Sequence, residues 1–168
     1  MKVQLINYTD DAVNLLIFTK NTRLMNDEDA YAKVSEWTEE KKQEELDYML
    51  KTIRSSWEFI DYTFNIRDVS RGFTHQFVRT RQASYAQQSQ RTVDMHGFGY
   101  YTPPRISENE VAKALYDDAM KQINEAYQAL RDIVPAEDAR GVLPTNIHTN
   151  IVAKFNLRTL SEMAKSRL

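Results

Sequence analysis

Apolar residues recur along the chain in two patterns, one typical of strands and one typical of helices. Residues 2–8 alternate in part between apolar and polar positions, which predicts a first β-strand. Residues 12–20 follow two aspartates that can cap a helix, and they place Val13, Leu16 and Ile17 on one face. The chain is therefore expected to begin with a strand followed by a helix.

Two further helices are predicted in the N-terminal third. The first is short, covers residues 30–36 and follows an acidic stretch that suits a helix start. The second begins after Thr38. Its apolar residues recur at three- and four-residue spacing, namely Leu46, Met49, Leu50 and Ile53.

The middle of the chain changes to a strand-like composition. Aromatic and β-branched residues dominate residues 57–66, which predicts a long strand. Residues 70–79 suit a helix, whose carboxyl end would present Arg79 and Arg81 where the helix dipole favours cations. Residues 82–91 are interpreted as a loop or irregular strand.

The C-terminal half is predicted to be mainly helical. Residues 107–110 form a capping box that starts the longest helix, over residues 111–134. Its inward positions are predicted to be Val111, Leu115, Ile123, Tyr127 and Leu130. The remaining elements are a short helix over 135–141, a short strand over 147–153 and a helix from Asn156 to the end. No repeat or linker interrupts this series, so we expect one α+β domain over residues 1–168, with a small, mostly antiparallel sheet packed with helices.

Length, composition and charge exclude several classes of protein. A chain of 168 residues, 42% hydrophobic and 27% charged, can bury a core as a single domain. Its net charge of −2 argues against a nucleic-acid binder, so any positive site must be local. No apolar run approaches membrane-spanning length, and the N-terminus lacks the features of a secretory signal. We therefore expect a cytoplasmic protein without a membrane partner.

The chain contains no cysteine. This excludes disulfides, zinc–thiolate sites and a cysteine nucleophile. The three histidines also lack a second histidine at metal-ligand spacing, so no metal site is predicted.

Residues 69–92 are the stretch most suited to binding chemistry. They contain the four arginines Arg71, Arg79, Arg81 and Arg91 and no acidic residue, and their second half is rich in Gln and Ser. Guanidinium groups bind phosphate bidentately, and Ser and Gln add neutral donors. Arginines in such a stretch are also often solvated or paired with carboxylates elsewhere, and composition alone leaves both interpretations open.

The spacing in this stretch favours the first interpretation. Arg79, one residue, Arg81, seven residues, Ser89 and then Gln90-Arg91 resemble the signature of flavin-dependent thymidylate synthases, which is Arg-His-Arg, seven residues and Ser. Three later segments also resemble that family: the Ala-Arg-Gly-Val-Leu-Pro of residues 139–144, the Asn-Leu-Arg of residues 156–158, and Arg167, nine residues after Arg158. The resemblance covers most of residues 52–168.

The resemblance implies a role for each matching residue. Arg167 would be the catalytic residue, lying by the uracil N3–O4 edge and favouring the ionised ring, whose C5 is then nucleophilic. The residues that would bind dUMP, here called the nucleotide set, are Gln76, Arg79, Gln87, Gln88, Ser89, Gln90, Arg91, Arg140 and Arg167. The residues that would bind FAD, here called the flavin set, are Ser55, Arg79, Thr80, Arg81, Gln87, Asn156, Arg158 and Glu162.

The chain departs from the family pattern at several places. Thr80 replaces the signature histidine, Thr92 a usual tyrosine and Ile53 a flavin-stacking histidine. The sequence also ends at Leu168, where family members usually continue. The resemblance is therefore to a divergent form that is short at its C-terminus.

The function that the resemblance implies is reductive methylation of dUMP to dTMP. Methylenetetrahydrofolate would supply the carbon and NADPH would reduce the FAD, a route that needs no protein thiol. The family forms homotetramers with shared active sites, so the chain would be its own partner. Two alternatives stay open: a relative with a different product, such as a hydroxymethylated pyrimidine, and a nucleotide-binding oligomer without catalysis.

Overall fold

The computed structural model of the chain describes residues 1–52 and 54–167. Ile53, one of the departures from the family pattern, lies outside the described residues. The contacts divide the chain into two compact units. Unit 1 consists of Met1–Val3, Asn65–Thr80 and Tyr85–Val152, and unit 2 of Gln4–Phe64, Arg81–Ser84 and Ala153–Leu168. The expectation of a single domain stays a prediction.

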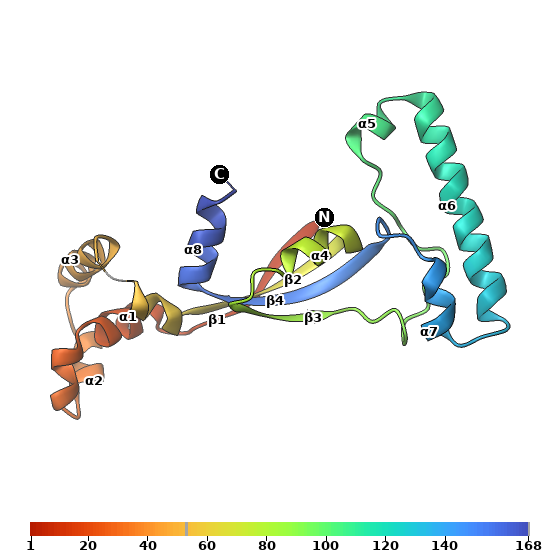
Figure 1. Cartoon of the computed structure of the whole chain (residues 1–168). Helices are drawn as coiled ribbons and strands as arrows, with labels where there is room; N and C mark the ends of the chain where they lie inside the picture. Colours follow the sequence, from red (N-terminus) through yellow and green to blue (C-terminus); the bar gives the residue numbers. More distant parts are fainter. Residues whose placement is uncertain (53, 168) are drawn as a thin grey trace. The chain divides into compact units, whose positions relative to one another are not determined.

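A four-stranded sheet contributes strands to both units (Figure 1). Its order is β1-β2-β4-β3, so β2 and β4 are central and β1 and β3 are the edges. The strands are β1 (Lys2–Tyr8), β2 (Asp61–Ser70), β3 (Ala83–Gln87) and β4 (His148–Asn156).

Neighbouring strands run antiparallel, as the pairing of their ends demonstrates. Thr9, just after β1, donates its N–H to the Asp61 carbonyl at the start of β2 (3.0 Å). The other end of β2 pairs with the start of β4, where the Asp68 N–H donates to Asn150 Oδ1 (3.2 Å). Gln88, just after β3, donates its N–H to the Asn150 carbonyl (2.9 Å). The predicted α+β class with a small antiparallel sheet is confirmed.

Unit 2 packs its helices around one apolar core. Helix α1 contacts α2, α3 and η2, and α8 also contacts η2. The core consists of Leu16, Met49, Trp57 and Ile60, with partly buried apolar residues around them. The elements are α1 (Ala12–Lys20), η1 (Thr22–Asn26), α2 (Ala30–Ser35), α3 (Glu39–Leu50), η2 (Ser55–Phe59) and α8 (Leu157–Lys165).

Unit 1 has a second core, beneath the longest helix. Met95, Tyr127, Ala139 and Ile147 are buried there, and Tyr127 and Ile147 have no exposed surface. Figure 1 shows α5 leading into α6 and α7 following it. The helices are α4 (Arg71–Phe77), α5 (Pro104–Ser107), α6 (Glu110–Arg131), α7 (Ala136–Ala139) and η3 (Arg140–Val142).

Four helices begin at a residue whose side-chain oxygen accepts a backbone N–H of the first turn. These N-caps are Thr38, Ser70, Asn109 and Asn156. Such caps satisfy donors that have no partner within the helix. The sequence predicted these helix starts to within a few residues because the caps are local signals.

Two predictions about α6 were wrong. The capping box was placed at Ser107, but Ser107 belongs to α5, where its hydroxyl donates to the Pro104 carbonyl (2.8 Å), and Asn109 caps α6 instead. Val111 and Leu115 were predicted to point inward, but they are 71% and 69% exposed. The apolar periodicity located the helix, yet only the second half of α6 lies on the core of unit 1.

The long strand predicted over residues 57–66 was also displaced. Residues 55–59 form the 3-10 helix η2, and the strand runs from Asp61 to Ser70. Trp57 is 9% exposed in the core of unit 2, with the Arg54 guanidinium 4.9 Å from its ring centre. Packing of this indole overrides the strand propensity of the segment.

The remaining differences are smaller. Residues 82–91 were interpreted as loop or irregular strand, but 83–87 form the regular edge strand β3. Val13, predicted to be inward on α1, is 41% exposed. Within the described residues, no helix is long and apolar enough to cross a bilayer.

Candidate functional site

The start of α4 is fixed to the segment that leads into β4. The Arg71 N–H donates to the Ile147 carbonyl (3.0 Å), and the Gly72 N–H donates to the Thr145 carbonyl (2.7 Å). A Cβ on Gly72 would lie 3.5 Å from that Thr145 oxygen, which is an ordinary van der Waals contact. Because these bonds join main chains, the positions of residues 71 and 72 do not depend on a flexible side chain.

The end of β3 is attached to the same helix by side chains. Gln87 donates from Nε2 to the hydroxyl of Thr74 (2.9 Å) and to that of Thr149 (3.5 Å). Thr74 is fully buried, and its hydroxyl donates to the Arg71 carbonyl (2.9 Å). A hydrogen-bonded chain therefore runs from Gln87 through Thr74 to Arg71.

A turn follows β3 and carries four more members of the nucleotide set. Asn150 Nδ2 donates to Gln88 Oε1 (2.8 Å), which anchors the turn to β4. The Ser89 hydroxyl accepts the N–H of Arg91 (3.1 Å). Gln90 is half-buried and Arg91 is exposed. The turn thus presents polar side chains next to a rigid strand end.

The arginines of the nucleotide set in unit 1 lack acidic partners. Arg79, Arg91 and Arg140 are exposed, and Arg140 donates from Nε to the Glu137 carbonyl (3.0 Å). Within the described residues, none of the three forms a salt bridge. Gln76, on α4, is also exposed. Unpaired guanidinium groups on a fixed backbone suit an anionic ligand.

Arg71 has a different environment from these exposed arginines. It is half-buried, and both its burial and the nearby charge of Arg140 lower the pKa of its guanidinium. No role was predicted for it, although it lies in the acid-free arginine stretch and its Val69-Ser70-Arg71 context resembles the family's version of this region.

The flavin set lies largely in unit 2, at the start of α8. Asn156 Oδ1 accepts the Thr159 N–H (2.8 Å) and so caps α8. Arg158 bonds Glu58 from Nη1 (2.6 Å) and Glu162 from Nε (3.2 Å). Hydrogen bonds to Glu162 and then to Glu58 raise the pKa of Arg158. The sequence predicted Arg158 and Glu162 as two cofactor ligands, whereas the structure pairs them with each other.

The other members of the flavin set differ in how they are held. Ser55 and Arg81 are exposed, and Arg81 forms no salt bridge within the described residues. Thr80, at the position of the signature histidine, is half-buried and accepts the Tyr85 hydroxyl at its carbonyl (2.9 Å). Arg167 lies exposed after α8, in unit 2, and its catalytic role stays a prediction.

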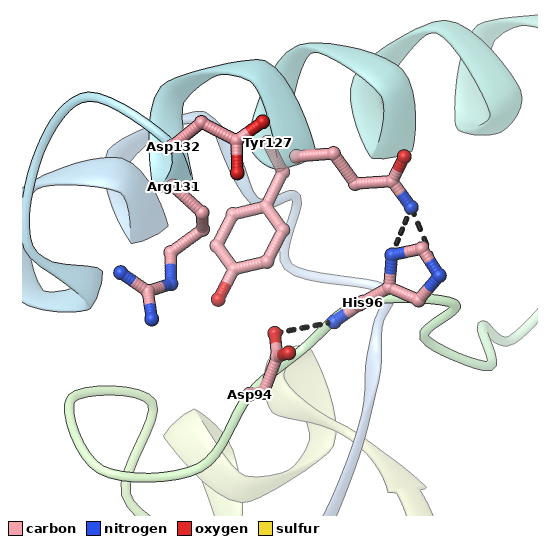
Figure 2. Close-up of a pocket in the computed structure, with 6 residues that line it drawn as sticks. Asp94, His96, Tyr127, Arg131 and Asp132 are labelled. Atoms are coloured by element: carbon pink, nitrogen blue, oxygen red, sulfur yellow. Dashed lines mark hydrogen bonds between the residues drawn. The ribbon is translucent and has the colours of Figure 1, made fainter.

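Unit 1 also contains a polar pocket that no prediction covered. Its volume is about 290 Å³. In the view of Figure 2, the Tyr127 ring lies between Arg131 and His96, and Asp94 lies below the ring. The backbone N–H of His96 donates to Asp94 Oδ1 (3.0 Å). Arg131 Nε is buried and has no hydrogen-bond partner among the described residues. The lining residues are Asp94, His96, Tyr127, Gln128, Arg131 and Asp132.

A second cavity in unit 1, of about 460 Å³, is mainly apolar. Its lining residues are Met1, Asp68, Val69, Ser70, Phe73, Tyr101 and His148. Neither cavity is lined by a member of the nucleotide or flavin sets. The arginine-rich group around α4, the end of β3 and η3 stays the predicted anion site.

Comparison with known proteins agrees with this chemistry. The model of the thymidylate synthase complementing protein family matches residues 4–168. The chain belongs to this family. Within it, the chain is 37% identical to the flavin-dependent thymidylate synthase of Sulfurisphaera tokodaii over 178 aligned positions, which cover 100% of the chain and 66% of that relative.

Two further relatives match over a smaller part of the chain. The flavin-dependent thymidylate synthases of Geobacter sulfurreducens and Nitratidesulfovibrio vulgaris are 44% and 40% identical over 110 and 119 residues. These alignments cover 64% and 66% of the chain, and 47% and 49% of the relatives. The chain therefore matches about half the length of these two relatives.

A solved structure supports the fold. The chain superimposes on the UMP/dUMP methylase PolB from Streptomyces cacaoi, solved with bound 5-Br dUMP, with a TM-score of 0.77 and 20% sequence identity. The superposition covers 95% of the chain and 74% of that protein. At this identity the similarity establishes a shared fold.

Proposed function

We propose that this protein is a flavin-dependent thymidylate synthase, which converts dUMP to dTMP by reductive methylation. Methylenetetrahydrofolate is the carbon donor and NADPH the reductant in this proposal. The observation that carries it is the match of the family model over residues 4–168, together with arginines at the signature positions that form no salt bridge within the described part of the chain. The names of the relatives and the 5-Br dUMP bound to the structural neighbour point to the same reaction.

The nucleotide set has roles that follow from its chemistry. Arg79, Arg91 and Arg140 neutralise the phosphate and orient the nucleotide, with Ser89 as a neutral donor. Gln76, Gln87, Gln88 and Gln90 supply amide donors and acceptors to the base and sugar. Arg167 stabilises negative charge on the uracil ring, which makes C5 nucleophilic.

The donor set of this chain fits FAD. Among the described residues, Arg81 and Arg79 are exposed cations without a carboxylate partner, which suits a pyrophosphate, and Ser55 adds a hydroxyl. Asn156, Arg158 and Glu162 hold the start of α8 in place through the cap and the ion pairs. When bound and reduced, FAD would supply the hydride for the methylation, a route that needs no cysteine nucleophile.

The proposal includes a homotetramer with shared active sites. The homotetramer is supported by the edge strand β1, every residue of which is exposed. Val3, Leu5, Ile6 and Tyr8 are apolar or aromatic and between 46% and 57% exposed. An apolar edge strand of this kind suits a contact with another copy of the chain.

Release of tritium from C5 of labelled dUMP tests the proposal. The protein, saturated with FAD and supplied with NADPH and methylenetetrahydrofolate, is expected to release tritium and form dTMP. Omission of NADPH should abolish turnover, and Arg167→Ala should reduce it strongly. Absence of release at saturating cofactors, in protein that still binds dUMP, would favour the non-catalytic alternative.

Product analysis separates the proposal from the alternative enzyme. Incubation with dUMP should give a methylated base, whereas a related one-carbon transferase would give a hydroxymethylated base. UMP serves as a second substrate in this assay because the structural neighbour is named for both nucleotides.

A further inference from the structure

Arg71 lies between two parts of the nucleotide set, although neither the signature nor the resemblance assigned it a role. Gln87 reaches it from β3, through the buried hydroxyl of Thr74 and the Arg71 carbonyl (2.9 Å for each bond). On the other side, Arg71 and Gly72 are bonded to Ile147 and Thr145, in the segment that follows η3. Main-chain bonds therefore fix Arg71 within the nucleotide-binding part of unit 1.

Among the described residues, no acidic side chain neutralises the charge of Arg71 through a salt bridge. Burial, followed by the charge of Arg140 at the start of η3, lowers the pKa of the Arg71 guanidinium. Within the described residues neither guanidinium forms a salt bridge. A half-buried arginine beside a second arginine is unfavourable unless an anion joins them, because burial and like charge both disfavour the ionised form.

A phosphate is the anion that best fits two arginines. Each guanidinium can donate two parallel hydrogen bonds to phosphate oxygens, so Arg71 can add to the contacts that the nucleotide set makes with the phosphate. The Arg71 backbone is held by hydrogen bonds at both its N–H and its carbonyl, so little ordering is needed when the ligand binds.

We propose that Arg71, together with Arg140, binds the 5′-phosphate of the nucleotide substrate. This inference rests on the proposed function, because it assumes that unit 1 binds a pyrimidine nucleotide. It adds a residue to the nucleotide set and makes Arg71 a determinant of selectivity for the nucleotide over the nucleoside.

Calorimetric titration of dUMP and of deoxyuridine into the FAD-saturated protein tests this role. Arg71→Gln is expected to weaken dUMP binding by about tenfold to a hundredfold, as the loss of charge-assisted hydrogen bonds predicts, and to leave deoxyuridine binding unchanged. Arg71→Lys should recover part of the dUMP affinity, because it keeps the charge but not the bidentate geometry. Arg105→Gln is the matched control: Arg105 is an exposed arginine of the same unit, on α5, and should change neither affinity.

The arms of the experiment have distinct meanings. Equal dUMP affinity in the wild type and Arg71→Gln overturns the inference, as does an equal loss of dUMP and deoxyuridine affinity, which would indicate a structural role. Loss of FAD affinity with unchanged dUMP affinity would assign the phosphate to the cofactor and also overturn it. Failure of the wild type to bind dUMP would instead refute the proposed function.

A folding defect in Arg71→Gln would leave Arg71→Lys as the decisive variant. Circular dichroism of both variants identifies that case. The ratio of dUMP to deoxyuridine affinity should then fall severalfold in Arg71→Lys, and inorganic phosphate should compete with dUMP less effectively than in the wild type. An unchanged ratio with unchanged competition would refute the role of Arg71.

Discussion

Gly99 lies beside the His148 ring at a distance that leaves no space for a side chain. A Cβ at this position would be 2.7 Å from His148 Nδ1, and the Gly99 carbonyl accepts the His148 N–H at 2.7 Å. The backbone bond holds residue 148 in place, so a Cβ at residue 99 would require the His148 ring to rotate. The glycine therefore permits a close contact between a loop and the sheet.

We expect Gly99→Ala to lower the free energy of unfolding by about 1–3 kcal/mol, the usual cost of overpacking. Urea denaturation measures it, with Gly141→Ala as the control, since no atom lies within 4 Å of a Cβ there. The control should change stability by less than about 1 kcal/mol, in the stabilising direction. Equal stability of the two variants would mean that His148 moves aside freely.

Tyr100 and Asp117 form a pair whose titrations shift in opposite directions. The Tyr100 hydroxyl donates to Asp117 Oδ1 (2.6 Å), and this bond, followed by burial, raises the pKa of Tyr100 to about 12. Bonds from Lys113 and then Tyr100 lower the pKa of Asp117. The stabilising contribution of Tyr100 is present below pH 10 and is lost as the pH rises towards 12. That of Asp117 is present above its ordinary pKa of 3.8 and is lost as the pH falls below it.

Asp117→Asn should lower the pKa of Tyr100 towards its ordinary value of 10. Ultraviolet absorbance of tyrosinate during alkaline titration measures the shift. Tyr100→Phe identifies the transition among the nine tyrosines, because it should remove only the component near pH 12. A titration of Asp117→Asn that matches the wild type would refute the pairing.

Single residues also mark the limit of sequence interpretation. The signature identified Arg79, Arg81, Ser89 and Arg91 because their spacing is a property of the chain itself. Arg71 lies outside that spacing, and the role that we propose for it depends on main-chain bonds to residues more than seventy positions away.

At the scale of elements, the start of α6 offers two residues that could cap the helix, and only one of them does so. Asn109 Oδ1 accepts the Ala112 N–H (3.0 Å), whereas the Ser107 hydroxyl bonds within α5. We expect Asn109→Ala to reduce stability by about 1 kcal/mol. Ser107→Ala, the control, should remain within about 0.5 kcal/mol of the wild type by thermal or urea unfolding. A larger effect at Ser107 would restore the capping box that the sequence predicted.

Elements were predicted best where the signal is local. The first strand and the starts of the helices at Ala12 and Glu39 agree closely with the prediction. Thr38 caps its helix as expected, whereas Asp11 makes no side-chain cap bond. The strand near Trp57 was displaced because the indole packs in a core built from distant residues. Its aromatic composition suited either a strand or a buried turn, and the core determined which formed.

At the scale of the whole molecule, β1 and the first half of α6 expose apolar residues. Val3, Leu5 and Ile6 on β1, and Val111 and Leu115 on α6, are 46% to 71% exposed. Surfaces of this kind are usually covered in an assembly. They are the structural basis for the proposed oligomer.

Leu5→Glu is expected to weaken self-association by at least about tenfold, because it replaces apolar contact area with a charge that must be desolvated. Sedimentation velocity over a range of protein concentrations measures this change. Gln4→Glu, the adjacent position on the same strand, adds the same charge without removing apolar surface and should retain the wild-type assembly. Identical sedimentation of both variants and the wild type would show that β1 lies outside the interface.

The sequence by itself determined the α+β class, most helix starts and the identity of the arginines in the signature, because caps, periodicity and motif spacing are encoded within short segments. Only the tertiary structure decided which guanidinium groups lack salt-bridge partners among the described residues, that Arg158 pairs with Glu58, and where Arg71 lies. Pairing and burial depend on which segments, distant in sequence, lie next to each other. The sheet determines this, because it brings β3 and the start of α4 together beside β4.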